Sequence, residues 1–91
     1  MAVSGSAAER MTNPRLPHAN DYVALGQALA QLRHAAGLTQ VQAGERIGVR
    51  SQFVSEVETG RRGMRWHTLL IVLDVYGATL HDLADAIEGQ R

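Results

Sequence analysis

The sequence has no cysteine and no lysine, and only one tryptophan and one phenylalanine among its 91 residues. Without cysteine there can be no disulfide, no thiolate nucleophile and no cysteine metal site. No apolar run approaches the roughly 20 residues that a membrane helix needs, and the N-terminus lacks the basic region and long apolar core of a secretory signal. We therefore expect a cytoplasmic protein that does not enter a membrane.

Motifs for catalysis are also missing. The chain contains no glycine-rich phosphate loop and no nucleophile motif, and its four histidines are scattered without the spacing of metal ligands. We expect no enzyme activity, no metal, no cofactor and no small-molecule substrate.

The length allows one small domain with a single core. Residues 1–20 are small and polar, contain both prolines and show no periodicity, so they predict a flexible N-terminal arm. Residues 21–91 then form the domain. Two interpretations of the arm stay open: Arg10 and Arg15 lie along a DNA backbone or minor groove, or the arm has no function.

Two short helices joined by a tight turn are predicted between residues 39 and 60. Thr39 and Gln42 have the spacing of a capping box, so a helix begins there. It ends at Gly48, which can adopt the left-handed conformation of a sharp turn. A second helix follows and ends at Gly60. Two helices around a short turn containing glycine are typical of a helix-turn-helix.

The second of these helices, which begins near Arg50 or Ser51, has one polar face. Val54 and Val57 are three residues apart and should point inward. The opposite side chains have the groups that bind base edges in a DNA groove: glutamine suits adenine, glutamate suits cytosine, and serine suits either. The face is either a DNA-reading surface or simply solvated; it consists of Ser51, Gln52, Ser55 and Glu56.

Helices are also expected on both sides of this pair. One begins after Asn20-Asp21 and runs to about Ala36, with a buried stripe that includes Leu25, Leu29 and Leu32. Another covers Trp66 to Tyr76, and spacings of three and four predict that its core face consists of Trp66, Leu69, Leu70, Leu73 and Tyr76.

A last helix should begin after Thr79, whose spacing to Asp82 gives a second capping box. In so small a protein, few other residues remain to cover the apolar stripe of this helix. We expect the stripe to form a homodimer contact, together with Val72 or Val75. The alternative is that it closes the core of the monomer. The stripe consists of Leu80, Leu83, Ala84 and Ile87.

Charge is unevenly distributed, although the formal net charge is zero. Residues 33–65 contain six arginines and three acids, whereas residues 66–91 contain one arginine and four acids. Three of the arginines, Arg61, Arg62 and Arg65, directly follow the second helix of the pair, where they would meet phosphates beside the groove. This asymmetry favours a DNA-facing side opposite a subunit or partner surface.

A longer pattern runs from Leu25 to Leu83. Its members are Leu25-Gly26, Arg33, Gly37-Leu38-Thr39-Gln40, Gly48-Val49 and Glu58-Thr59-Gly60. Their residue types and spacing resemble the Cro/cI-type (XRE) helix-turn-helix family. The resemblance implies an all-α, five-helix bundle of the lambda repressor-like class. The chain departs from the family at Ala43-Gly44, where a leucine followed by alanine is usual, and at Arg50, where a serine or threonine cap is common.

The resemblance also implies roles for single residues. Thr39 and Gln40 match positions that hold phosphate. Arg33 and Glu58 match an ion pair that ties the first helix to the end of the helix that reads DNA. The positions that match base-reading residues are Arg50, Ser51, Gln52 and Glu56.

The function implied is a transcription regulator, most often a repressor, that binds a palindromic operator in double-stranded DNA as a homodimer. One alternative is an antitoxin with a toxin as partner, because residues 53–58 also resemble HipB-like antitoxins, although the expected helical C-terminus departs from the strand that those proteins use for pairing. The other is a helix-turn-helix that serves only as a protein-interaction module.

Overall fold

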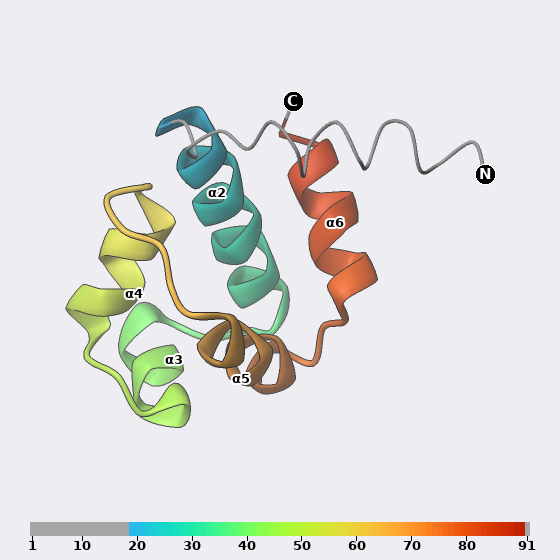
Figure 1. Cartoon of the computed structure of the whole chain (residues 1–91). Helices are drawn as coiled ribbons and strands as arrows, with labels where there is room; N and C mark the ends of the chain where they lie inside the picture. Colours follow the sequence, from blue (N-terminus) through green and yellow to red (C-terminus); the bar gives the residue numbers. More distant parts are fainter. Residues whose placement is uncertain (1–18, 91) are drawn as a thin grey trace, which may run out of the picture.

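The computed structural model describes residues 19–90, which contain five helices and no strand (Figure 1). The all-α, five-helix prediction is confirmed. The arm expected over residues 1–20 lies outside the described residues, except that its last two residues already belong to the first helix. The helices are α2 (Ala19–Ala35), α3 (Gln40–Ile47), α4 (Ser51–Glu58), α5 (Trp66–Tyr76) and α6 (Leu80–Glu88).

Helix α2 is the centre of the fold. It packs against α4, α5 and α6, and α6 lies beside it along its length (Figure 1). Ala28 and Leu29 are fully buried on α2, while Leu25 and Leu32 are partly buried against the same core. Helices α3 and α4 form a pair on the other side of α2, and α5 lies beside α3 and below α2, where it closes the core.

Helix α5 buries only part of the face that was predicted. Leu73 and Tyr76 are buried and Leu69 packs partly against the core, as expected, whereas Trp66 is 62% exposed and Leu70 is 41% exposed. Val72 is also buried, so it is not available to the dimer contact that the sequence suggested for it. The prediction of a core role for Trp66 and Leu70 was wrong. Apolar side chains surround this helix on nearly every side, so their spacing does not identify which side packs against α2 and α3.

Helix α6 begins at the predicted capping box. Thr79 Oγ1 accepts from the Asp82 N–H over 3.0 Å, and Asp82 Oδ2 accepts from the Thr79 N–H over 2.8 Å. The hydrogen bonds from Thr79 lower the pKa of the Asp82 carboxyl.

The apolar stripe of α6 is divided between the core and the surface. Leu83 is buried against the core and Ile87 packs partly against it. Leu83 is therefore not available to a second subunit, and its assignment to a dimer contact is corrected. Leu80 and Ala84 remain exposed. The stripe mainly closes the monomer core, because α6 lies on α2.

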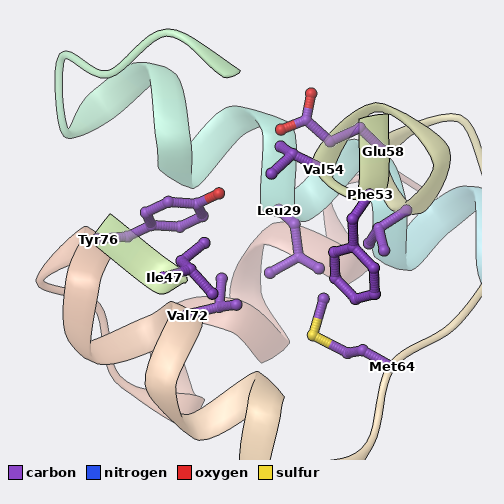
Figure 2. A pocket seen from close by; sticks show the side chains of 9 residues that line it. Leu29, Ile47, Phe53, Val54, Glu58, Met64, Val72 and Tyr76 are labelled. Atoms are coloured by element: carbon purple, nitrogen blue, oxygen red, sulfur yellow. The ribbon is translucent and has the colours of Figure 1, made fainter. Parts of the chain in front are cut away.

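A small cavity remains inside the core (Figure 2). Its volume is about 10 Å³, close to the lower limit for a single water molecule. The lining is mostly apolar and includes Leu29, Val57 and Val72, with Glu58 and Tyr76 as polar groups. Burial raises the pKa of Tyr76 to about 12, and the nearby Glu58 carboxylate acts in the same direction. The cavity is too small for an organic ligand.

Candidate nucleic-acid interface

The turn between α3 and α4 is built from local capping chemistry. Thr39 Oγ1 accepts from the Gln42 N–H over 3.0 Å, and Gln42 Oε1 accepts from the Thr39 N–H over 2.9 Å, which is the predicted capping box. Gly48 ends α3 with a φ of 93°, a left-handed conformation that favours glycine. Its N–H donates to the Gly44 carbonyl over 2.8 Å. The two helices are therefore joined by only three residues, Gly48, Val49 and Arg50.

Gly44 lets the two helices of the pair approach each other closely. A Cβ at this position would lie 2.7 Å from the Val49 carbonyl oxygen and 3.2 Å from the Ser51 nitrogen. The residue is buried, as is Ala43 before it. This close packing explains the glycine at position 44, because the Cβ of the alanine that is usual in the family would push α4 away from α3.

Helix α4 turns its polar face outward. Val54 and Val57 are buried, Ser51 and Gln52 are exposed, and Ser55 and Glu56 are half-buried on the same side. An α-helix with short polar side chains on its exposed face can enter a major groove.

Arg50 precedes the first turn of α4 and occupies the N-cap position. Its backbone is extended, with φ −75° and ψ 152°, and its side chain makes no capping hydrogen bond. Ser51 is the first residue of the helix and does not serve as its cap. The exposed Arg50 guanidinium is not used for capping. It lies at the N-terminal end of α4, where it is free to contact a ligand.

The Arg33 and Glu58 side chains form a two-point ion pair between α2 and the end of α4. Arg33 Nε donates to Glu58 Oε2 over 2.6 Å, and Nη2 donates to Oε1 over 3.0 Å. Both side chains are nearly buried, at 7% and 8% exposed. Arg33 Nη1 also donates to the Leu38 carbonyl over 2.8 Å. The hydrogen bonds to Glu58 raise the pKa of Arg33, despite the opposing effect of burial.

Gln40 joins this ion pair from the start of α3. Its Nε2 donates to Glu58 Oε1 over 2.9 Å. One amide proton of Gln40 is therefore directed to Glu58, and a phosphate would have to take the other. Thr39, whose hydroxyl already accepts the capping bond, keeps an O–H donor at the exposed start of the same helix.

The arginines after α4 are all exposed but differ in their contacts. Arg65 occupies the N-cap position of α5 without a side-chain capping bond. Arg61 makes no side-chain hydrogen bond within residues 19–90. Arg62 folds back over α4: its guanidinium carbon lies 4.8 Å from the centre of the Phe53 ring, and its Nη1 lies 3.4 Å from Glu56 Oε1. Nothing in the sequence indicated that Phe53 lies at the interface. Its contact with Arg62 arises only because the chain folds back over α4 after Gly60, and no local spacing indicates that path.

A shallow groove opens at this edge of α4. It is lined by Val49, Arg50, Gln52, Phe53, Glu56 and Arg62. The groove brings together three of the predicted base-reading residues and one of the loop arginines. Ser51 lies beside it on the same helix, whereas Thr39 and Gln40 approach from α3.

Elsewhere, residues 19–90 contain no group of three histidine or acidic side chains placed to hold a metal. In the same part of the chain, no helix is both long and apolar enough to cross a membrane.

Comparison with known proteins gives a consistent result. A model of the helix-turn-helix domain family matches residues 24–86. No curated protein matches the chain.

Solved structures of two regulators are among those similar to the chain. One crystal structure of the clp gene regulator ClgR from Corynebacterium glutamicum has a TM-score of 0.72 and 28% identity, over 85% of this chain and 96% of that chain. A second ClgR structure has a TM-score of 0.72 and 30% identity over 81% and 77%. The restriction-modification controller protein C.AhdI from Aeromonas hydrophila has a TM-score of 0.66 and 30% identity over 70% and 97%. These likenesses confirm the lambda repressor-like fold that the sequence predicts.

Proposed function

The chain belongs to the helix-turn-helix domain family, and we propose that it is a sequence-specific DNA-binding transcription regulator. It binds a palindromic operator as a homodimer and acts as a repressor. The observation that carries the proposal is the polar outer face of α4, which stands free of the core between exposed arginines on both sides. A helix with this face enters the major groove, with half-sites about 34 Å apart for a dimer.

The base-reading and phosphate-binding roles follow from position. Arg50, Ser51 and Gln52 lie at the exposed start of α4, the end that contacts base edges in helix-turn-helix proteins. Phosphates on either side of the groove are held by two groups of residues. Thr39 and Gln40 lie at the start of α3, while Arg61 and Arg65 come from the loop that follows α4.

The functions of the similar proteins support regulation rather than catalysis. ClgR is a clp gene regulator and C.AhdI is a restriction-modification controller protein. Each is similar to this chain over most of its own length. Their target genes do not identify the operator of this chain, because residues on the reading face decide which operator is bound.

A homodimer needs a surface, and α5 offers one. Trp66, Leu70 and Ile71 are exposed on its outer side, and His67 and Asp74 are exposed on the same side. Leu70 and Ile71 lie in the middle of this face, with His67 three positions before Leu70 and Asp74 three positions after Ile71. Two copies of α5 packed antiparallel there would bring His67 against the partner's Asp74 at both ends, as a two-fold interface requires. Leu80 and Ala84 remain as the exposed part of the surface on α6 that the sequence predicted.

Fluorescence anisotropy tests the proposal directly. The protein is titrated against the DNA upstream of its own gene and against a shuffled duplex of equal composition, at about 150 mM salt. Preferential binding with two chains per duplex is the expected result. Equal weak binding to both duplexes would contradict it and would favour a protein partner, such as a toxin encoded beside this chain.

A further inference from the structure

Glu56 connects two other side chains on the outer face of α4. Its Oε1 accepts from Arg62 Nη1 over 3.4 Å, and its Oε2 accepts from Gln52 Nε2 over 3.3 Å. Arg62 is at the same time stacked on Phe53, 4.8 Å from the ring centre, which is within the range of a cation–π contact. The result is a continuous row of polar contacts from Gln52 through Glu56 to Arg62 across the face proposed to read DNA.

The backbone that carries Arg62 is fixed on both sides. Gly60 has a φ of 78°, and a Cβ there would lie 2.8 Å from Val23 Cγ2. A Cβ on Gly63 would lie 2.8 Å from Tyr22 Cε1. The loop therefore rests against α2 at two points that flank Arg62. A side chain that starts from a fixed backbone and is held by a ring and a carboxylate has fewer arrangements than a free surface arginine.

We propose that Arg62 reads a guanine base from the edge of α4, and that Glu56 is a positioning residue that holds both Arg62 and Gln52. This inference rests on the proposed function and revises two roles that the sequence predicts. Arg62 is then not a phosphate contact, and Glu56 is not a reader of cytosine. Guanine is the base that arginine recognises best, through two hydrogen bonds to O6 and N7 in the major groove.

The chemistry of the guanidinium fits this role. Arginine has five N–H donors in a rigid fork, and its Nη1 is directed to Glu56. The remaining donors are left for the parallel pair of hydrogen bonds that guanine accepts. Gln52 has one amide proton on Glu56 and keeps its carbonyl and second proton for adenine.

Pairing with Arg62 offsets the negative charge of Glu56 on the face proposed to bind DNA. A free carboxylate on a DNA-facing helix would be repelled by phosphates, and the Arg62 charge removes this repulsion. The pair is largely open to solvent in the free protein, at 49% exposed for the Arg62 side chain and 33% for the half-buried Glu56, so it contributes little to stability there. Its effect should appear in DNA discrimination, once water is displaced from the groove.

The experiment begins with selection of bound duplexes from a random pool by the unmodified protein, which defines a preferred site from binding alone. Binding to that site and to a shuffled duplex is then measured at one salt concentration. The variants are Arg62→Ala, Arg62→Lys and Glu56→Gln, with Arg61→Ala as the matched control. Thermal unfolding by circular dichroism confirms that each variant is folded.

Arg62→Ala should weaken binding to the selected site about 5- to 150-fold, the cost of one lost bidentate base contact. It should weaken binding to the shuffled duplex far less. Arg62→Lys keeps the charge but loses the fork, so it should lose preference for the selected site while binding shuffled DNA as before. Glu56→Gln removes a negative charge, so shuffled DNA should bind equally well or more tightly while the preference falls. Arg61→Ala should weaken binding to both duplexes by the same factor.

Two results would overturn the inference while leaving the proposed function intact. One is an equal loss on both duplexes for Arg62→Ala, as for Arg61→Ala, which would make Arg62 a phosphate contact. The other is an unchanged base preference when selection is repeated with Arg62→Ala. If the unmodified protein enriches no sequence at all, the proposed function itself fails and this inference falls with it.

Discussion

Arg33 and Glu58 form a nearly buried ion pair, with Arg33 Nε 2.6 Å from Glu58 Oε2, although they are 25 positions apart in the sequence. The pair joins the end of α2 to the end of α4. The Leu38 carbonyl accepts from Arg33, and Gln40 donates to Glu58, so the charged groups have further hydrogen-bond partners in the fold. Helix α4, which we propose reads DNA, is thereby fixed to the central helix α2 at its C-terminal end.

Removal of either member of this pair should be costly. We expect Arg33→Ala or Glu58→Ala to lower the free energy of unfolding by about 3–5 kcal/mol, because the remaining charge would be left buried without a partner. The double variant Arg33→Met/Glu58→Leu should lose less than either single change. Urea unfolding measures each value. Arg62→Ala, which removes the exposed partner of Glu56, is the control and should cost less than about 1 kcal/mol. A similar small loss for Arg33→Ala would show that the pair contributes little.

The helix-turn-helix itself offers a second test at Gly44. Helix propensity alone predicts that Gly44→Ala stabilises the protein by about 1 kcal/mol. We expect destabilisation instead, because the new Cβ would lie 2.7 Å from the Val49 carbonyl oxygen. The matched control is Gly89→Ala, at the end of α6, where the backbone is right-handed and the nearest atom to a Cβ would be 3.5 Å away. Thermal unfolding of both variants measures the difference, and stabilisation by Gly44→Ala would contradict the packing argument.

Much of the fold was predictable because its signals are local. The capping boxes at Thr39 and Thr79 involve residues three positions apart, and both helices begin where these residues predict. Gly48 ends α3 because its backbone adopts the left-handed conformation that favours glycine. The orientation of α5 was not predictable in this way. Its sides are apolar nearly all round, so only packing against α2 and α3 decides that Val72 is buried and Trp66 is exposed.

In the candidate site, too, some features follow from local spacing in the sequence and others only from the folded chain. The outward face of α4 follows from the inward positions of Val54 and Val57, which the sequence displays. The contact of Arg62 with Phe53 and Glu56 depends on the path of the chain after α4, which no local spacing encodes. Gly44 carried a misleading local signal: in isolation it weakens a helix, whereas in the fold it allows α3 and α4 to meet.

Alkaline pH should destabilise the protein through Tyr76. Its pKa is about 12 in the folded chain against an ordinary value of 10.0, because burial disfavours the charged phenolate. A raised pKa gives a contribution to stability that is complete below pH 10 and is lost as the pH rises from 10 through 12. The sequence has no lysine or cysteine, so side chains of these two types contribute nothing to the loss.

The measurement is urea unfolding of the unmodified protein and two variants at several values between pH 9 and pH 12. Stability of the unmodified protein should fall across this range, and Tyr76→Phe should make the fall much shallower. Tyr22→Phe is the control for general effects of base and should retain the fall. An unchanged slope in Tyr76→Phe would assign the loss to another cause.

We expect the outer face of α5 to form the interface of the proposed homodimer. Trp66 is the sole tryptophan and is 62% exposed on this face, so its emission should shift to shorter wavelength when the chains associate. In an antiparallel pair, Leu70 and Ile71 lie at the centre. We expect Ile71→Glu to abolish the dimer in sedimentation velocity, because two like charges would meet at the two-fold axis. The control is Leu80→Glu on α6, an equally exposed apolar site at 46% against 44% for Ile71.

A charge exchange tests the register of the same interface. His67→Asp and Asp74→His should each weaken association, because each removes the proposed pairing of His67 with the partner's Asp74. The double variant His67→Asp/Asp74→His should restore association below pH 6, where histidine is charged. Circular dichroism confirms the fold of each chain. If Leu80→Glu breaks the dimer while Ile71→Glu does not, the interface lies on α6 as the sequence alone predicts, and the exposed apolar side chains of α5 serve another contact.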